Sequence, residues 1–398
     1  AWERNSVKLM IALACGLPVA TWFVLAGHSD EVVHALVEYG QFITLLLALS
    51  SIGLVAMYSS GYDHGTRFID HGRNMLLAAA ILFVVAQVPP QKIMFAAVPL
   101  YVLGIALLIA VLVFGITKKG AQRWVNVGVV IQPSELLKIA MPLMLAWWFQ
   151  RREGATRVSD FVVAFGLLAL PTALILKQPD LGTALLVLAS GLAVIFFAGL
   201  SWKLVLPPVL LAAVGIVLLI WNGDALCMDG ISWYFLHDYQ RTRVCTLLDP
   251  MRDPLGKGFH IIQGMIAIGS GGIWGKGFMA GTQTHLEFIP ERTTDFIFAA
   301  FSEEFGLVGN LVLITGFVLL VWRALAIALQ ATTLFGRLMA AAVAVIFFTY
   351  AFVNMGMVSG ILPVVGLPLP FLSYGGTAMV TLGLALGILM SIARAQRL

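Results

Sequence analysis

Residues 288–322 read FIPERTTDFIFAAFSEEFGLVGNLVLITGFVLLVW, and this stretch joins two regions of opposite character. Up to Asp295 it closes a long polar region, roughly residues 222–295. Residues 296–322 are then mostly apolar and long enough to cross a bilayer as a helix. A carboxylate at such a boundary faces water, headgroups or a molecule carried by lipid. The stretch therefore predicts a membrane protein with Asp295 at the mouth of a helix.

Apolar segments recur along the whole chain of 398 residues, which is 60% hydrophobic and only 11% charged. A soluble core cannot bury that much apolar surface, so the surrounding solvent must be lipid. The segments are too long for barrel strands, and backbone groups in lipid must be satisfied internally. We therefore expect an all-α fold, a polytopic transmembrane helical bundle of ten core helices plus an extra apolar N-terminal segment. The segments lie near 7–27, 41–60, 73–89, 93–115, 134–150, 160–177, 181–200, 204–221, 296–322, 338–358 and 376–393.

One membrane domain is expected at 41–398, with a large extracytoplasmic loop at 222–295 and an unassigned N-terminal segment at 1–40. Lys and Arg in short loops mark the cytoplasmic side of a membrane protein. Counting helices places the following on that side: Arg151, Arg152, Arg157, Lys203, Arg323, Arg337, Arg394 and Arg397. The charges flanking 7–27 favour the opposite orientation. This segment is an extra helix in an unusual orientation, an interfacial segment or a foreign piece.

The chain contains three cysteines. Cys15 falls in an apolar segment and is expected to serve only packing. Cys227 and Cys245 both fall in the outer loop, where an oxidising compartment permits a bridge between them. A disulfide and two free thiols both remain open.

Two opposite charges enter the membrane at the start of segment 134–150. Pro133 suits the first turn of a helix, and Glu135 suits the positive end of the helix dipole. The i, i+3 spacing places Glu135 and Lys138 on one face, and a charge as deep as Lys138 is costly unless it is paired. The pair is either a structural unit that neutralises itself or part of an outward-open cavity that holds an anionic group.

Two outer connections carry further polar residues. Asp180 lies in QPDLGT (178–183), where it can cap the following helix, contribute to a site, or do both. Lys119 and Arg123 lie in KKGAQRW (118–124). This connection is either an interfacial loop with a Trp anchor or a loop that recognises phosphate.

The large outer loop and the helix after it hold the remaining charged candidates. Gln240 and Arg243 lie in HDYQRTR (237–243). Glu303 and Glu304 follow Asp295 by two helical turns. Carboxylates within a membrane are functional by default, but entry from the interface could leave these two in water.

Residues 359–376 are rich in Pro and Gly and cannot form a continuous helix. Irregular backbone at membrane depth requires protein cover or a cavity, so we expect this broken segment, which contains Ser373, to form the back wall of a site. Metal and nucleophile sites have little support, because zincin His spacing, CxxC and GxSxG are all absent. Scattered basic residues argue against nucleic-acid binding.

Four of these motifs, in this order along the chain, resemble the SEDS family, whose members include RodA, FtsW and SpoVE. They are QPSE at 132–135, QPDLGT at 178–183, the run 288–309 and the run 354–376. The resemblance covers roughly residues 40–398. HDYQ at 237–240, the run 288–298 and NMGMVSGILP at 354–363 look closest to RodA, the member that acts in cell elongation.

The resemblance implies a peptidoglycan glycosyltransferase that polymerises lipid II at the outer face of the bacterial inner membrane, beside a class B penicillin-binding protein and other elongation-complex proteins. It implies that Asp295 is the essential aspartate and that Glu135 and Lys138 are the family's intramembrane ion pair. With this chemistry in mind, the expected general base is Asp295. A divalent cation, Mg or Mn, is a candidate cofactor. The expected substrate-binding residues are Lys138, Glu135, Arg123, Lys119, Asp180, Gln240, Arg243 and Ser373.

Two rival functions remain open. A polytopic bundle with intramembrane charges could flip lipid II, or it could be a non-catalytic scaffold for a penicillin-binding protein. A base on the outer rim favours the polymerase, since a flippase has no need of one. In that case Glu135, Lys138, Asp180 and Asp295 should face one polar cavity that opens sideways to lipid, because each is too costly to leave against acyl chains.

Overall fold

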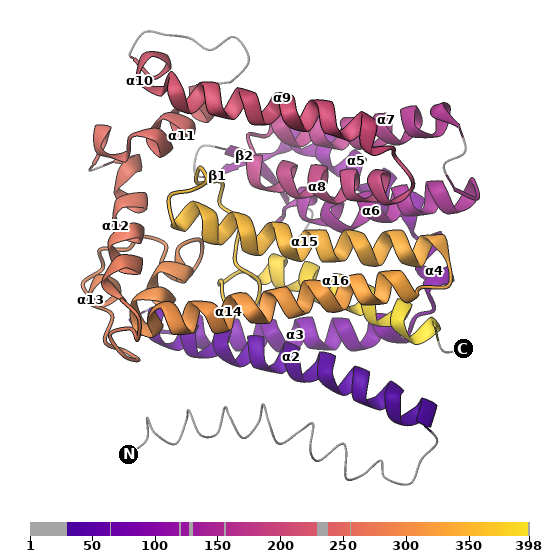
Figure 1. The fold of residues 1–398 in the computed structure, drawn as a ribbon, viewed down its shortest axis with the longest axis horizontal. Helices are drawn as coiled ribbons and strands as arrows, with labels where there is room; N and C mark the ends of the chain where they lie inside the picture. The colour runs from indigo at the N-terminus through magenta and orange to yellow at the C-terminus, as the bar shows by residue number, and fades with distance from the viewer. Residues whose placement is uncertain are drawn as a thin grey trace.

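The structure is a computed structural model that describes residues 30–63, 65–118, 121–126, 130–154, 157–228, 238–254 and 256–396. The N-terminal segment predicted at 7–27 lies outside these ranges, as do Cys15 and Lys119. Within them the chain is a bundle of long helices that run side by side, and this confirms the predicted fold (Figure 1).

Each of the ten predicted core segments is a helix. They are α2 (Asp30–Ser60), α3 (Arg67–Gln87), α5 (Ala97–Phe114), α6 (Pro133–Arg151), α7 (Val158–Lys177), α8 (Leu181–Phe197), α9 (Trp202–Trp221), α14 (Ile297–Gln330), α15 (Leu334–Val358) and α16 (Gly376–Ala395). The short α4 (Pro90–Phe95) precedes α5, and the two together form one candidate span. Among the described residues, eight spans are long and apolar enough to cross a membrane. The other two helices are α6, which carries two charges near its start, and the shorter α8.

The connection 116–133, expected as a loop, contains a small antiparallel sheet. Its strands are β1 (Ile116–Lys118), β2 (Ala121–Asn126) and β3 (Val130–Ile131), in the order β1-β2-β3. Strands this short carry too few residues for an alternating pattern to be recognised in the sequence. The sheet places Arg123 on its middle strand, and α6 begins at Pro133 directly after the last strand.

The large outer loop is built from short helices at one end of the bundle, on the left in Figure 1. They are α10 (Gly223–Leu226), α11 (Asp238–Leu248), the 3₁₀ turn η1 (Pro250–Arg252), α12 (Lys257–Ser270) and α13 (Thr282–His285). Cys227 and Cys245 form a disulfide with their Cα atoms 5.6 Å apart, which settles the alternative left open by the sequence. The bridge ties α11 to the residue that follows α10.

Gly306 interrupts α14 about three helical turns after Asp295. Its φ of 62° and ψ of −160° lie outside the helical region, in backbone that L residues rarely adopt. The amide of Leu307 donates instead to the carbonyl of Gly272 (2.9 Å), and that of Val308 to Ile273 (3.1 Å). The outer loop is therefore hydrogen-bonded into the break.

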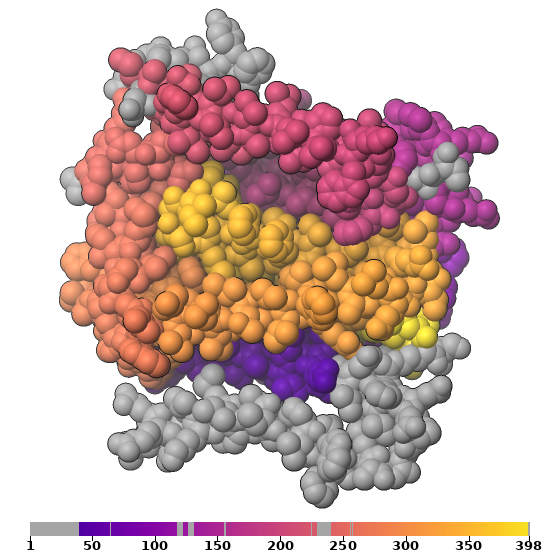
Figure 2. All heavy atoms as spheres, viewed as in Figure 1, coloured from indigo at the N-terminus to yellow at the C-terminus, as the bar shows by residue number. Residues whose placement is uncertain are grey.

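Packing is uneven across the bundle. Most of α15 and α16 is buried, whereas no residue of α9 is buried. Figure 2 shows the consequence: the surface is hollowed between α9 and the neighbouring helices. The ten-helix fold thus has a packed centre and one helix that stands apart from it.

Candidate active site

Asp295 lies in the turn that leads from the outer loop into α14 and is half-buried. The turn is hydrogen-bonded to the broken segment 359–375. The amide of Tyr374 donates to the carbonyl of Thr293 (2.8 Å), and the hydroxyl of Ser373 donates to the carbonyl of Thr294 (2.7 Å). The same hydroxyl accepts from the amide of Leu369 (2.7 Å), so Ser373 holds backbone on both sides. The expected back wall is in contact with the turn that carries Asp295.

The carboxylate of Asp295 lies beside Gly366. A Cβ added at Gly366 would lie 3.4 Å from Oδ2 of Asp295, and the φ of +76° at this glycine is one that other residues rarely adopt. The side-chain amide of Asn354, on α15, donates to the carbonyls of Asp295 (3.0 Å) and Leu367 (2.7 Å). The sequence marked Asn354 only as the first residue of the motif 354–363 and gave no sign of its contact with Asp295.

Arg292 anchors the other side of the turn. Its buried guanidinium donates to the carbonyl of Ser60 (3.0 Å) and pairs with Asp63, both at the outer end of α2. Arg67, on α3, donates to the hydroxyl of Thr293. These partners lie more than two hundred residues away along the chain, which explains why the sequence did not reveal them.

The predicted ion pair is present at the start of α6. Nζ of Lys138 donates to Oε1 of Glu135 (2.6 Å) and to the hydroxyl of Tyr350 (2.9 Å). The other oxygen of Glu135 accepts from Thr381 (3.4 Å). Lys138 is only 1% exposed, so its ammonium is satisfied inside the protein. This geometry supports the structural interpretation of the pair, and a role in holding an anion remains a prediction.

Asp180 caps α8 by accepting from the amide of Thr183 (3.3 Å), so the capping interpretation is confirmed. Its carboxylate also accepts from Gln132 (2.8 Å) and Ser134 (3.4 Å), at the start of α6. Nη1 of Arg123 lies 3.7 Å from it. The cap therefore joins α8, α6 and the small sheet into one polar cluster.

One face of α15 links this cluster to the turn at Asp295. Tyr350 contacts Lys138, and Asn354, one helical turn further on, contacts the peptide of Asp295. The two groups of polar residues are therefore neighbours along α15. The polar cavity expected between them, open to lipid, remains a prediction.

The candidates on α11 reach the same broken segment. The guanidinium of Arg243 donates to the carbonyl of Val364, two residues before the glycine that faces Asp295. Gln240 lies one turn earlier on α11 and is half-buried. The disulfide to Cys245 fixes α11 in this position.

Glu303 and Glu304 are buried, so water does not reach them as it would at an interface. Glu303 accepts from Lys276 (2.7 Å) and from the amide of Gln283 (2.9 Å), and Glu304 accepts from Ser59. Both side chains fasten the outer loop or α2 to α14. Glu303 and Glu304 therefore have a structural role near the helix break at Gly306.

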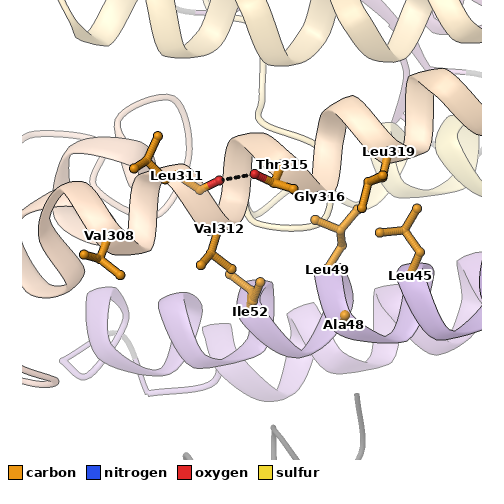
Figure 3. Close-up of a pocket in the computed structure, with 10 residues that line it drawn as sticks. All are labelled: Leu45, Ala48, Leu49, Ile52, Val308, Leu311, Val312, Thr315, Gly316 and Leu319. Atoms are coloured by element: carbon orange, nitrogen blue, oxygen red, sulfur yellow. Dashed lines mark hydrogen bonds between the residues drawn. The ribbon is translucent and has the colours of Figure 1, made fainter. Parts of the chain in front are cut away.

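A groove of about 430 Å³ runs between α2 and α14 and is lined almost entirely by apolar side chains. Figure 3 shows its lining, in which Leu45, Leu49 and Ile52 face α14. Its one hydroxyl, that of Thr315, donates to the carbonyl of Leu311 in its own helix (2.7 Å). The groove offers no group for proton transfer. In the described part of the chain no three His, Cys, Asp or Glu side chains gather in a way that could hold a metal ion, so we derive no step through one.

The described residues thus form a multi-pass helical membrane protein. The sequence model of the FtsW/RodA/SpoVE family, described as "Cell cycle protein", matches residues 33–398, and the chain belongs to this family. It is 49% identical over 352 residues to the peptidoglycan glycosyltransferase MrdB of Escherichia coli K12, covering 88% of this chain and 91% of that protein.

The solved structures that are similar to this chain include the following two. One comes from a study titled "Structural coordination of polymerization and crosslinking by a peptidoglycan synthase complex", with a TM-score of 0.73 and 33% identity over 89% of this chain and 97% of the other. The second is the rod shape determining protein RodA of Thermus thermophilus, with a TM-score of 0.64 and 26% identity over 90% of this chain and 97% of the other. Both agree with the family resemblance in the sequence.

Proposed function

We propose that this chain is a peptidoglycan glycosyltransferase that polymerises lipid II into glycan strands at the outer face of the bacterial inner membrane during cell elongation. The observation that carries the proposal is Asp295, a half-buried carboxylate held at the outer mouth of α14 by hydrogen bonds to its turn. The name of the E. coli relative, peptidoglycan glycosyltransferase, supports the reaction class.

In this reaction the 4-hydroxyl of the acceptor sugar attacks the anomeric carbon of a donor sugar linked to a lipid diphosphate. Asp295 accepts the hydroxyl proton as the new bond forms, and general-base assistance of this kind contributes roughly 10²–10⁴-fold. The α-linked donor gives a β-linked product, so the transfer inverts the anomeric centre and needs no covalent sugar–enzyme intermediate. The carboxylate needs a fixed direction, which its backbone contacts provide.

The leaving diphosphate gathers negative charge and requires cations. Arg123 is the better placed of the cations on the α6–α8 side, because its side chain is 26% exposed whereas that of Lys138 is 1% exposed and bound to Glu135. Arg243 reaches the broken segment beside Asp295 and is the candidate on the other side. Lys119 keeps its predicted role on the basis of the sequence.

The lipid tail of the substrate has to stay in the bilayer while its sugar reaches Asp295. The hollow beside α9 supports a lateral entry, because no residue of that helix is buried against the rest of the described bundle (Figure 2). In this proposal Asp180 and Glu135 contribute the polar wall of the entry, and the hydrogen bond from Ser134 to Asp180 at the start of α6 supports their proximity. A class B penicillin-binding protein that cross-links the strands is the proposed partner, and the synthase complex among the similar structures supports it.

The test is polymerisation of labelled lipid II by purified protein, with and without the partner, resolved as glycan chains on a gel. We expect Asp295→Asn to lower the rate by roughly 10²–10⁴-fold without lowering the melting temperature. Asp249→Asn is the matched control, since Asp249 is an exposed cap of η1 and asparagine caps equally well.

The outcomes separate the three candidate functions. Near-normal polymerisation by well-folded Asp295→Asn would show that Asp295 is not the general base. Wild-type protein that moves fluorescent lipid II between leaflets but never polymerises it, even with the partner, would identify a flippase. Protein that does neither yet still binds the partner would identify a scaffold.

A further inference from the structure

Asn354 is a fully buried amide near the end of the apolar helix α15. Its Nδ2 group donates to the carbonyl of Asp295 (3.0 Å) and to the carbonyl of Leu367 (2.7 Å). Two carbonyl acceptors require an NH₂ group, because a flipped amide would set its oxygen against both of them. The two acceptors therefore fix the orientation of this side chain.

The fixed orientation leaves the other half of the amide unsatisfied. Oδ1 of Asn354 is buried and has no hydrogen-bond partner within the described part of the chain. An unpaired buried oxygen is costly, and an apolar residue of the same size would avoid that cost. The cost of this oxygen is set against the two carbonyls that the amide satisfies, so the two donors are the feature that an apolar residue would lack.

The side-chain NH₂ group of Asn354 donates to two separate backbone segments on either side of the Asp295 carboxylate. One acceptor is the peptide of Asp295 itself, and the other is the peptide of Leu367, next to the glycine that faces Oδ2 of Asp295. One rigid amide thus sets the spacing between the carboxylate and the wall it lies against. In these contacts Asn354 binds only backbone carbonyls. Any effect of Asn354 on the reaction would therefore come from the position that it gives to Asp295.

We propose that Asn354 is a positioning residue that holds the peptide of Asp295 against residues 366–367 and so directs its carboxylate at the acceptor hydroxyl. The proposal rests on the proposed function of Asp295 as general base. A misplacement of about 1 Å in a reacting group can cost about a hundredfold in rate. Loss of the clamp should therefore slow turnover and leave substrate affinity unchanged.

The decisive variant is Asn354→Leu, which keeps the number of side-chain heavy atoms and the branch at Cγ, removes both donors and also removes the unpaired oxygen. We expect kcat for lipid II polymerisation to fall about ten- to a hundredfold, with KM within twofold and only a small loss of melting temperature, from the two carbonyls left without this donor. The matched control is Asn310→Leu on α14, whose amide oxygen accepts from Ser302 (3.0 Å) within the same helix, and its kcat should match wild type. Asn354→Ser, which keeps one donor, should give an intermediate kcat.

A double variant separates positioning from a general structural role. In the Asp295→Asn background Asn354→Leu should slow the residual reaction no further, since the group it directs is already lost. Normal kcat for Asn354→Leu together with an inactive Asp295→Asn would overturn this inference and leave the proposed function standing. Activity of Asp295→Asn would overturn the proposed function first. Failure of both Asn354→Leu and Asn354→Ser to fold would show that the amide holds the bundle, and would also overturn the inference.

Discussion

The first turn of α6 and the turn that leads into α14 each carry a carboxylate, but the two are held in different ways. At α6 the partner of Glu135 is Lys138, three residues along the same helix and 2.6 Å away. At α14 the turn that carries Asp295 is held by Asn354, Ser373 and Tyr374, all of which arrive from later parts of the chain.

The contacts in α6 neutralise the charge of Glu135, whereas the contacts at the start of α14 fix the direction of the Asp295 carboxylate. A pair within one helix can form as soon as the helix forms, and its two charges satisfy each other before Tyr350 and Thr381 join them in the folded bundle. A turn whose backbone is held from several sides is fixed only in the complete bundle, and a reacting group on it is pre-organised. We therefore expect the Glu135–Lys138 pair to contribute mainly to stability and the turn at Asp295 to contribute mainly to the reaction.

The strongest test at the α6 end is Lys138→Ala. It leaves Glu135 without its cation, and breaking a buried pair in this way costs roughly 3–5 kcal/mol. We expect a lower melting temperature in addition to lost activity, whereas Asp295→Asn should lose activity alone. Thermal unfolding of both purified variants checks the contrast.

A double variant, Glu135→Gln with Lys138→Met, removes both charges together and should recover most of the stability. Recovered activity would make the pair purely structural, while continued inactivity would give it a role in binding the diphosphate. A stable, active Lys138→Ala would contradict both interpretations.

Removing the disulfide between Cys227 and Cys245 should have a smaller effect, confined to the segments that pack near Asp295. Replacing Cys227 and Cys245 by serine opens a bridge between residues 18 apart, worth about 3 kcal/mol by loop entropy. Because α11 carries Arg243 to the carbonyl of Val364, we expect faster hydrogen exchange at 238–248 and 364–367. Exchange at 133–141 should stay as in wild type. Equal loosening at both ends would show that the bridge stabilises the whole bundle.

The smallest effect concerns pH and His260 on α12, whose ring centre lies 5.7 Å from that of Phe296. Burial lowers the pKa of His260 below its ordinary value of 6.5, and the carboxylate of Glu291 partly opposes this. The unfolded chain therefore binds this proton more readily. The stability associated with neutral His260 is present above pH 6.5 and is lost as the pH falls through the lowered pKa. His260→Gln should flatten the dependence of melting temperature on pH between about 5 and 7, and an unchanged slope would assign that dependence to other groups.

Several features followed from the sequence because they depend on neighbours along the chain. Segment lengths and composition predicted the ten core helices, and i, i+3 spacing predicted the contact between Glu135 and Lys138. Asp180 was recognisable as a cap from its position after Pro179 at a helix start. The resemblance to the family rested on short contiguous motifs, and the family comparison confirmed it.

Other features required the folded bundle. The three-stranded sheet is too short to give a periodic signal, and the break at Gly306 lies within a stretch whose composition resembles a continuous helix. Glu303 lies in an apolar segment, and nothing in that segment predicts the ion pair with Lys276 or the packing of the loop 222–295 against Glu303. The sequence left its exposure open, and the tertiary contacts make it a buried structural residue.

The sequence by itself determined that this chain crosses a membrane, where its helices lie, and that Asp295 stands at a helix mouth, because hydropathy and spacing act over short distances. The tertiary structure decided what holds Asp295. Asn354, Ser373 and Gly366 meet its turn only when α15 and the broken segment pack beside α14. Hydrogen bonds between distant parts of a chain leave no periodic trace in the sequence, so the direction of the carboxylate is a property of the folded bundle.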